Sequence, residues 1–221
     1  LMKHIVVDLE MNGVGKEYKN LGCNMETIEI GAIMLDDNFQ EISSFRTYVK
    51  PEYNTRVTSV VSKLTGINYN MLINAPKFNE ALKMFSNWCM GVDDDIKIYA
   101  WSTNDYRQVF KEIKLKHYEI SSDESRVYLT EWNDFQEEFD AELGFDKQVS
   151  LSLALDMAGI DFLGREHSAL DDARNTAKLF HVFKDREMFD ITLSKIAEAM
   201  KPTEFGTSLG SLFDFSGFEV A

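Results

Sequence analysis

Two carboxylates stand at the end of the first apolar stretch of the chain, Ile5-Val6-Val7-Asp8-Leu9-Glu10. If this stretch is a β-strand, its side chains alternate between the two faces, so Asp8 and Glu10 point one way and Leu9 points the other. Two buried carboxylates on one face are unfavourable unless a cation lies between them. Proteins usually hold divalent metal ions in this way. The stretch therefore indicates a metal site, although solvated acids at a strand end are the alternative.

A third acid, Asp105, follows an apolar strand expected at 96–100. Ligands gather at the carboxyl ends of strands in open α/β sheets, and Trp101 begins the polar stretch at this end. Asp105 also lies at the start of a helix expected over 104–115, where the helix dipole favours a carboxylate. The alternative is a capping role only, and Thr103 or Asn104 is the expected cap.

A fourth acid, Asp172, belongs to a helix expected over 168–185. At 100° per residue, Asp172 falls within the broad apolar face of this helix, whereas Asp171 falls opposite and is expected to be solvated. His167 is expected in the loop just before the helix, where it could move relative to a fixed Asp172. The alternative for His167 is an ordinary polar residue at the surface.

Together these residues describe a phosphoryl-transfer site. Four carboxylates around one site suit two hard cations, Mg²⁺ or Mn²⁺. Two ions roughly 3.5–4 Å apart stabilise the attacking and leaving oxygens of an in-line displacement. A histidine can take a proton from the attacking water near neutral pH. The candidate metal ligands are Asp8, Glu10, Asp105 and Asp172. The candidate general base is His167, which is also expected to contact the substrate.

The order of the elements predicts an α/β fold, a mixed sheet flanked by helices. A polar loop is expected at 11–25 and a turn at 36–38, so the first three strands form an antiparallel meander. Strands are expected at 5–10, 26–35, 42–49, 96–100 and 127–129. Helices are expected at 58–64, after Pro76 to about 90, and near 104–115, 131–143, 151–158, 168–185 and 187–200.

The composition fits one domain, expected over residues 1–204, because 44% of the 221 residues are hydrophobic. Residues 205–221 are rich in aromatic residues and are expected to pack on this domain, on a second copy or on a protein partner. No apolar run reaches the roughly 18–20 residues that a membrane span needs. The two cysteines lack metal-site spacing and favour a reducing, cytoplasmic location.

The net charge of −14 argues against a large basic groove for nucleic acid. It does not exclude an enzyme that holds a few nucleotides through metal ions. We therefore expect short oligonucleotides to serve as well as long ones.

The motifs match a known family between about residue 3 and residue 184. Its central motifs are Asp8-Leu-Glu10, Glu29-Ile-Gly-Ala-Ile33, Asp105 after Trp101, and His167-x-x-x-x-Asp172-Ala173. Further matches are Leu64-Thr-Gly-Ile67, Ala75-Pro-x-Phe78 and Gly164-Arg165-x-His167. With these motifs the chain resembles the DEDDh 3′→5′ exonucleases, a DnaQ-like group, and most of all the branch of the KapD proteins and the histone-mRNA and small-RNA trimming exonucleases.

The resemblance implies an RNase H-like fold with a five-stranded mixed sheet. It also implies that the four acids hold two metal ions, that His167 activates water, and that nucleoside 5′-monophosphates leave a single-stranded 3′ end. The branch favours RNA slightly over DNA. A catalytically silent nucleic-acid-binding or scaffold module of the same fold is the main alternative, and a metal-dependent phosphomonoesterase is another.

Substrate contacts are expected beside the acids. In the family, the groups after the first acidic motif face the terminal nucleotide, and Met11-Asn12-Gly13 occupies these positions here. Trp101 and Leu64, like Tyr106, could stack on or wedge the terminal base, with core packing as the alternative. Glu29 is expected to be structural or to support the metal ligands rather than to be a fifth ligand, because it lies one strand over.

Overall fold

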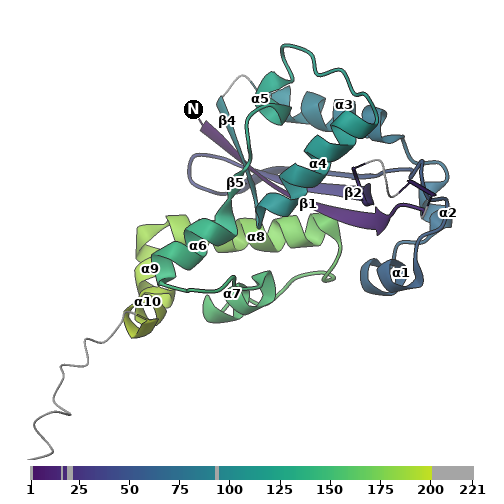
Figure 1. Ribbon diagram of the computed structural model, residues 1–221. Coiled ribbons are helices and arrows are strands. Elements are labelled where there is room, and N and C mark those ends of the chain that lie inside the picture. Colours follow the sequence, from purple (N-terminus) through teal and green to yellow (C-terminus); the bar gives the residue numbers. More distant parts are fainter. Residues whose placement is uncertain (1, 16, 19–21, 93–94, 201–221) are drawn as a thin grey trace, which may run out of the picture.

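A five-stranded mixed sheet runs through the centre of the computed structural model, between two layers of helices (Figure 1). The structure describes residues 2–15, 17–18, 22–92 and 95–200, so the expected tail at 205–221 lies outside the described residues. The strands are β1 (Met2–Gly13), β2 (Met25–Leu35), β3 (Glu41–Tyr48), β4 (Asp95–Ala100) and β5 (Asn133–Asp134).

The strand order is β3-β2-β1-β4-β5. The pairs β1–β2 and β2–β3 are antiparallel, and the pairs β1–β4 and β4–β5 are parallel. The predicted α/β fold, with a five-stranded mixed sheet whose first three strands are antiparallel, is therefore confirmed. The central place of β1 makes it the strand around which the other elements gather.

The fifth strand was predicted at the wrong residues. Residues 127–129 overlap a helical turn, α5 (Ser125–Tyr128), whose Val127 is buried. A short apolar run fits a buried turn of helix as well as a strand. The true fifth strand, β5, has only two polar residues, and its pairing with Tyr99 and Ala100 of β4 defines it.

The helices cover both faces of the sheet (Figure 1). On one face lie α3 (Phe78–Met90), α4 (Thr103–Leu115) and α5, and on the other lie α6 (Phe135–Leu143), α7 (Leu151–Met157), α8 (Ala169–Lys184), α9 (Arg186–Thr192) and α10 (Ser194–Met200). Two short helices, α1 (Ser59–Thr65) and α2 (Tyr69–Leu72), lie near one end of the sheet. No helix in the described part of the chain is long and apolar enough to cross a membrane.

Several predicted boundaries shift. The loop expected from residue 11 begins later, because β1 continues to Gly13 after a register shift between Glu10 and Met11. The helix expected at 187–200 is split into α9 and α10, and α2 was not predicted. The helix expected near 131–143 begins only at Phe135. Ser102, rather than Thr103 or Asn104, caps α4 through its side chain.

Alternation along β1 divides its side chains between two cores. Ile5, Val7 and Leu9 belong to the core under α3 and α4, whereas Val6 belongs to the core under α8. Asp8 and Glu10 continue the Val6 side of the strand. The first strand therefore presents both carboxylates toward α8.

Gly31 lets α8 approach the sheet. It pairs with Asp8 across the β1–β2 ladder, and a Cβ atom at Gly31 would lie 2.2 Å from the backbone carbon of Ala169. Because no side chain fits between the helix start and the strand, the first turn of α8 lies directly over the carboxylates of β1. The glycine thus sets the distance between the two acid-bearing elements.

We expect Gly31→Ala to lower the free energy of unfolding by about 1–3 kcal/mol, since overpacking displaces backbone here. Thermal and denaturant unfolding of the purified variant measure this loss. Gly13→Ala is the matched control, because a Cβ atom there meets nothing within 4 Å. Equal unfolding free energies for the two variants would contradict the close approach of α8.

Candidate active site

Asp105 reaches the site from the start of α4. Ser102 ends the chain leading from β4 and caps the helix by accepting a hydrogen bond from the Asn104 backbone. Asp105 lies in the first turn and is buried, at 7% exposure. Although burial raises the pKa of this carboxyl, the nearby backbone N–H of Leu9 acts to lower it, so the acid lies against β1.

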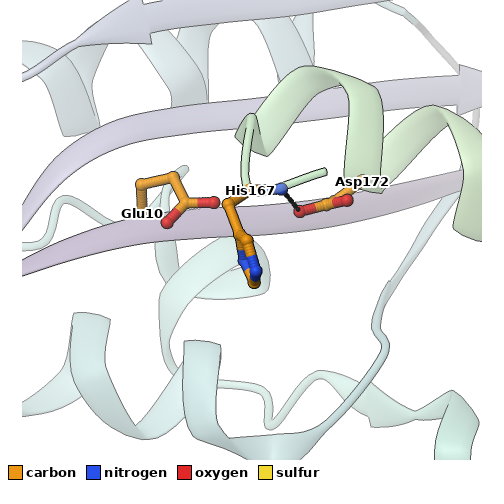
Figure 2. Close-up of side chains that lie close together, drawn as sticks. All are labelled: Glu10, His167 and Asp172. Carbon is orange, nitrogen blue, oxygen red and sulfur yellow. Dashed lines mark hydrogen bonds between the residues drawn. The ribbon is translucent and has the colours of Figure 1, made fainter. Parts of the chain in front are cut away.

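Asp172 reaches the site from the first turn of α8, and His167 lies in the loop just before this helix. The backbone N–H of His167 donates to Asp172 Oδ2 at 3.0 Å (Figure 2). His167 has a φ of 62°, in the left-handed region that non-glycine residues adopt rarely. The backbone of His167 is therefore tied to Asp172, while its exposed ring makes no hydrogen bond with any described residue.

Figure 2 shows the carboxylates of Glu10 and Asp172 on either side of His167, whose ring extends away from the space between them. One potential ligand atom from each lies within 4.8 Å of the other two. Asp8 and Asp105 fall outside this group of three, although the charge of Asp105 raises the pKa of both Asp8 and Glu10. His167, expected as the base and as a substrate contact, thus also lies close enough to two acids to share a metal ion with them.

The four carboxylates have strongly raised pKa values. Burial raises the pKa of Glu10 to about 8, with help from the charges of Asp172, Glu29 and Asp105. Burial also raises the pKa of Asp105 to about 7 and that of Asp172 to about 6. For Asp8, burial and then the neighbouring Asp105 and Asp172 hold the pKa well above its usual range. A cluster that disfavours its own negative charge has the electrostatics of a cation site.

These raised pKa values predict how the stability of the metal-free protein depends on pH. The unfolded chain releases these protons near pH 4, about the ordinary carboxyl pKa. The folded protein retains protons up to about pH 8 at Glu10. The folded state therefore binds more protons in this window, and its stability falls as the pH rises.

Asp8→Asn removes one of these charges, so in EDTA we expect it to unfold at a higher temperature than the unmodified protein. The gap in Tm should widen between pH 5 and pH 8, and saturating Mg²⁺ should reverse its sign. Thermal melts at several pH values measure it. A difference in Tm that does not change with pH would contradict the raised pKa values of these carboxylates.

Asp171 is not simply solvated, as was expected. Its Oδ2 accepts a hydrogen bond from the backbone N–H of Arg165 at 3.0 Å, and its side chain is 27% exposed. The helical wheel placed Asp171 and Asp172 on different faces of the helix, as the structure does. It could not show that Asp171 forms a hydrogen bond with the loop before the helix. The two neighbouring acids thus face different parts of the structure.

We expect Asp172→Ala to lower the cleavage rate by at least about 10²-fold, because it removes a charge from the site and the tether of His167. Asp171→Ala should cost only about tenfold, through the loop. Parallel rate measurements compare the two variants. Equal losses would contradict the assignment of Asp172 to the site.

Glu29 is buried and holds α8 in place. Its Oε2 accepts a hydrogen bond from the backbone of Ala169 at 3.2 Å, and its Oε1 pairs with Arg46. The Ser168 cap makes no side-chain hydrogen bond, so Glu29 satisfies a free N–H at the start of the helix. This arrangement agrees with the structural role expected for Glu29.

Asn12 requires a correction among the expected substrate contacts. Its side chain is fully buried, donates to the carbonyl oxygen of Arg56 at 3.0 Å and accepts from the backbone of Thr58 at 3.1 Å. The Nδ2 and Oδ1 atoms of this amide are therefore both hydrogen-bonded to the segment that leads into α1. Sequence reasoning could not find this role, because the partners lie more than 40 positions away.

The other expected contacts lie in different settings. Met11 is half-buried and packs on the core under α3 and α4, whereas Leu64 on α1 is 49% exposed. The carbonyl oxygen of Gly13 accepts a hydrogen bond from Asn54. Trp101 packs edge-on against Phe135, and its buried Nε1 has no hydrogen-bond partner among the described residues.

A cavity of about 300 Å³ opens between the acids and α7. Its polar side includes Asp8, His167 and Asp172, and its apolar side includes Trp101 and Phe162. Sequence reasoning missed the contribution of α7, whose Ser150 and Leu151 complete the lining with Ser152 and with Glu166 of the loop. Such a cavity can place charged and apolar parts of one ligand side by side.

Comparison with known proteins places this arrangement in a family. The family model RNase_T, described as Exonuclease, matches residues 5–180. The chain belongs to the RNase_T exonuclease family. The match covers all four acids and His167, and it confirms that the chain is of the exonuclease family.

Relatives within the RNase_T family carry exoribonuclease names. The chain is 30% identical to ERI1 exoribonuclease 2 of Mus musculus over 94% of its own length and 32% of that protein. It is 26% identical to 3′-5′ exoribonuclease 1 of Rattus norvegicus, over 70% of this chain and 45% of that protein. The chain thus spans about a third to a half of the length of these relatives.

Solved structures confirm the fold. The nuclease domain of 3′hExo, a DEDDh family member bound to rAMP, has a TM-score of 0.70 at 21% identity, covering 82% of this chain and 90% of that one. Cell-death related nuclease 4 has a TM-score of 0.69 at 19% identity, over 82% and 63% of the two chains.

Proposed function

We propose that this protein is a metal-dependent 3′→5′ exonuclease that removes nucleoside 5′-monophosphates from single-stranded nucleic acid. The observation that carries the proposal is the convergence of Asp8, Glu10, Asp105 and Asp172 from β1, α4 and α8, beside His167. The relatives named exoribonucleases support RNA as the slightly preferred substrate over DNA. A structural neighbour described as bound to rAMP supports the same choice.

The donor set fits divalent cations. Four oxygen-bearing acids with raised pKa values suit Mg²⁺ or Mn²⁺, and two ions per site would be held by Asp8, Glu10, Asp105 and Asp172. When bound, such ions stabilise negative charge on the attacking and leaving oxygens of a phosphodiester. A structural neighbour is described as the Mg²⁺- and Mn²⁺-bound form, which supports this choice.

His167 supplies the proton acceptor in this proposal. Its backbone is fixed through Asp172, whereas its exposed ring is free to turn toward a water molecule beside the acids. The imidazole takes the proton of the attacking water and passes it to solvent. Asp172 therefore contributes negative charge to the site and also positions the base.

The terminal nucleotide fits the cavity between the acids and α7. Its scissile phosphate lies at the polar side, and its base lies against Trp101 and Phe162. In this proposal Leu64 on α1 and Met11 on β1 border the same region. The backbone of Gly13 also contacts the terminal nucleotide. The free, buried Cys23 and Cys89 support a reducing, cytoplasmic setting. For the tail at 205–221 we propose contact with a second copy of the chain or with a protein partner.

A 5′-labelled single-stranded RNA incubated with the protein and Mg²⁺ tests the proposal. A ladder that shortens from the 3′ end is the expected result. Bound metal without any product would favour a binding or scaffold module, and loss of the terminal phosphate alone would favour a phosphomonoesterase. Strands of 5 and 30 nucleotides should be shortened at similar rates, because the net charge of −14 offers no large basic groove.

A further inference from the structure

Arg165 forms a bridge beside the site that the proposed chemistry does not use. It lies in the connection between α7 and α8, two positions before His167. Its Nη2 donates to the backbone carbonyl oxygens of Lys63 at 3.3 Å and of Leu64 at 3.1 Å. The last carbonyl groups of a helix lack partners within the helix, and a cation there also complements the helix dipole. The guanidinium therefore caps the C-terminal end of α1.

The end of α1 is shaped to receive this guanidinium. Gly66 follows the helix with a φ of +74°, and a Cβ atom at Gly66 would lie 1.9 Å from Arg165 Nη1. Glycine here permits both the left-handed turn and the close approach of the arginine. The end of α1 and the loop that carries Arg165 therefore fit each other at this contact.

The other end of the bridge is fixed on α8. Asp171 accepts from the backbone N–H of Arg165 and Asp172 accepts from that of His167, each at 3.0 Å. Gly164 has a φ of +90°, and a Cβ atom there would lie 2.4 Å from the Asp171 carboxyl carbon. Two consecutive acids of α8 thus hold two alternate N–H groups of one loop, and Arg165 is anchored by both its backbone and its side chain.

We infer that Arg165 is a positioning residue that sets the distance between α1 and the His167 loop. The inference rests on the proposed function, because it joins a group that contacts the 3′ nucleotide, Leu64, to the group that accepts the proton, His167. In Figure 1 the connection that leads into α8 lies beside α1. Removing the bridge leaves every carboxylate of the site in place. The loss is therefore expected in turnover rather than in metal binding.

Arg165→Ala tests the bridge. We expect kcat to fall about tenfold or more, since small displacements of a reacting group are costly. The affinity for Mn²⁺ and the Tm should stay close to those of the unmodified protein, because the side chain is at the surface. Arg165→Gln retains a donor for the carbonyl groups and should recover part of kcat. Arg186→Ala is the matched control, since Arg186 also makes a surface bridge, to Asp190, but within α9.

The decisive comparison places Arg165→Ala in a His167→Ala background. If Arg165 acts by placing His167, the double variant turns over at nearly the rate of His167→Ala alone. Amide hydrogen exchange should also quicken at 165–168 and 64–66 in Arg165→Ala, but not in Arg186→Ala. Multiplicative losses in the double variant, or unchanged kcat in the single one, would overturn the inference. Absence of 3′-end shortening by the unmodified protein would instead overturn the proposed function.

Discussion

We expect Asp8→Asn to abolish 3′-end cleavage and to weaken the binding of divalent metal, while the protein remains folded. The change keeps the shape of the side chain but removes the charge that β1 presents to the other acids. The pKa of Asp8 is held well above its usual range by burial and by Asp105 and Asp172, so this carboxylate lies at the electrostatic centre of the site. Calorimetric titration with Mn²⁺ and the rate of shortening of a labelled strand measure the two effects.

Asp146→Asn is the matched control for this substitution, because Asp146 is an exposed carboxylate outside the site. It should cleave and bind metal as the unmodified protein does. Retained activity in Asp8→Asn would remove β1 from the proposed site, and the assignment of Glu10 would then fail with it.

His167→Ala should leave metal binding nearly intact and lower the rate by roughly 10²–10⁴-fold, the usual contribution of a general base. The φ of 62° at His167 adds a complication, because alanine is strained in this region. His167→Asn resolves it, since asparagine tolerates the left-handed region but cannot act as the base. Both variants should therefore show similar losses in single-turnover measurements at saturating Mg²⁺.

His117 offers a matched control for both changes. It is exposed and also has a positive φ, of 51°, but it follows α4 at the end remote from Asp105. His117→Ala and His117→Asn should cleave at the unmodified rate. If His167→Asn kept full activity, the proton acceptor would have to be another group.

Local periodicity predicted the parts of the site that lie within one element. The alternation of β1 put Asp8 and Glu10 on one face, and the helical wheel of α8 separated Asp172 from Asp171. Both inferences need only the geometry of a strand or a helix. The mixed sheet followed from the order of the elements in the same way.

Features that depend on distant partners could not be predicted. Asn12 lies next to the acids in sequence, but its amide is used by residues 56 and 58. β5 has no pattern of its own, because only its pairing with β4 defines it. Asp171 was placed on the outer face of its helix, yet the loop at 164–165 folds back onto it. In each case the role of the residue depends on a tertiary contact, which the local sequence pattern does not reveal.

We propose that the four carboxylates and His167 together hydrolyse nucleic acid from its 3′ end. The most direct test uses 5′-labelled RNA and DNA of identical single-stranded sequence, each incubated with the protein in Mg²⁺ and in EDTA, with the released products separated by chromatography. We predict nucleoside 5′-monophosphates and a ladder shortening from the 3′ end in Mg²⁺ only, somewhat faster on RNA. Internal fragments, nucleoside 3′-monophosphates or undiminished cleavage in EDTA would contradict the account.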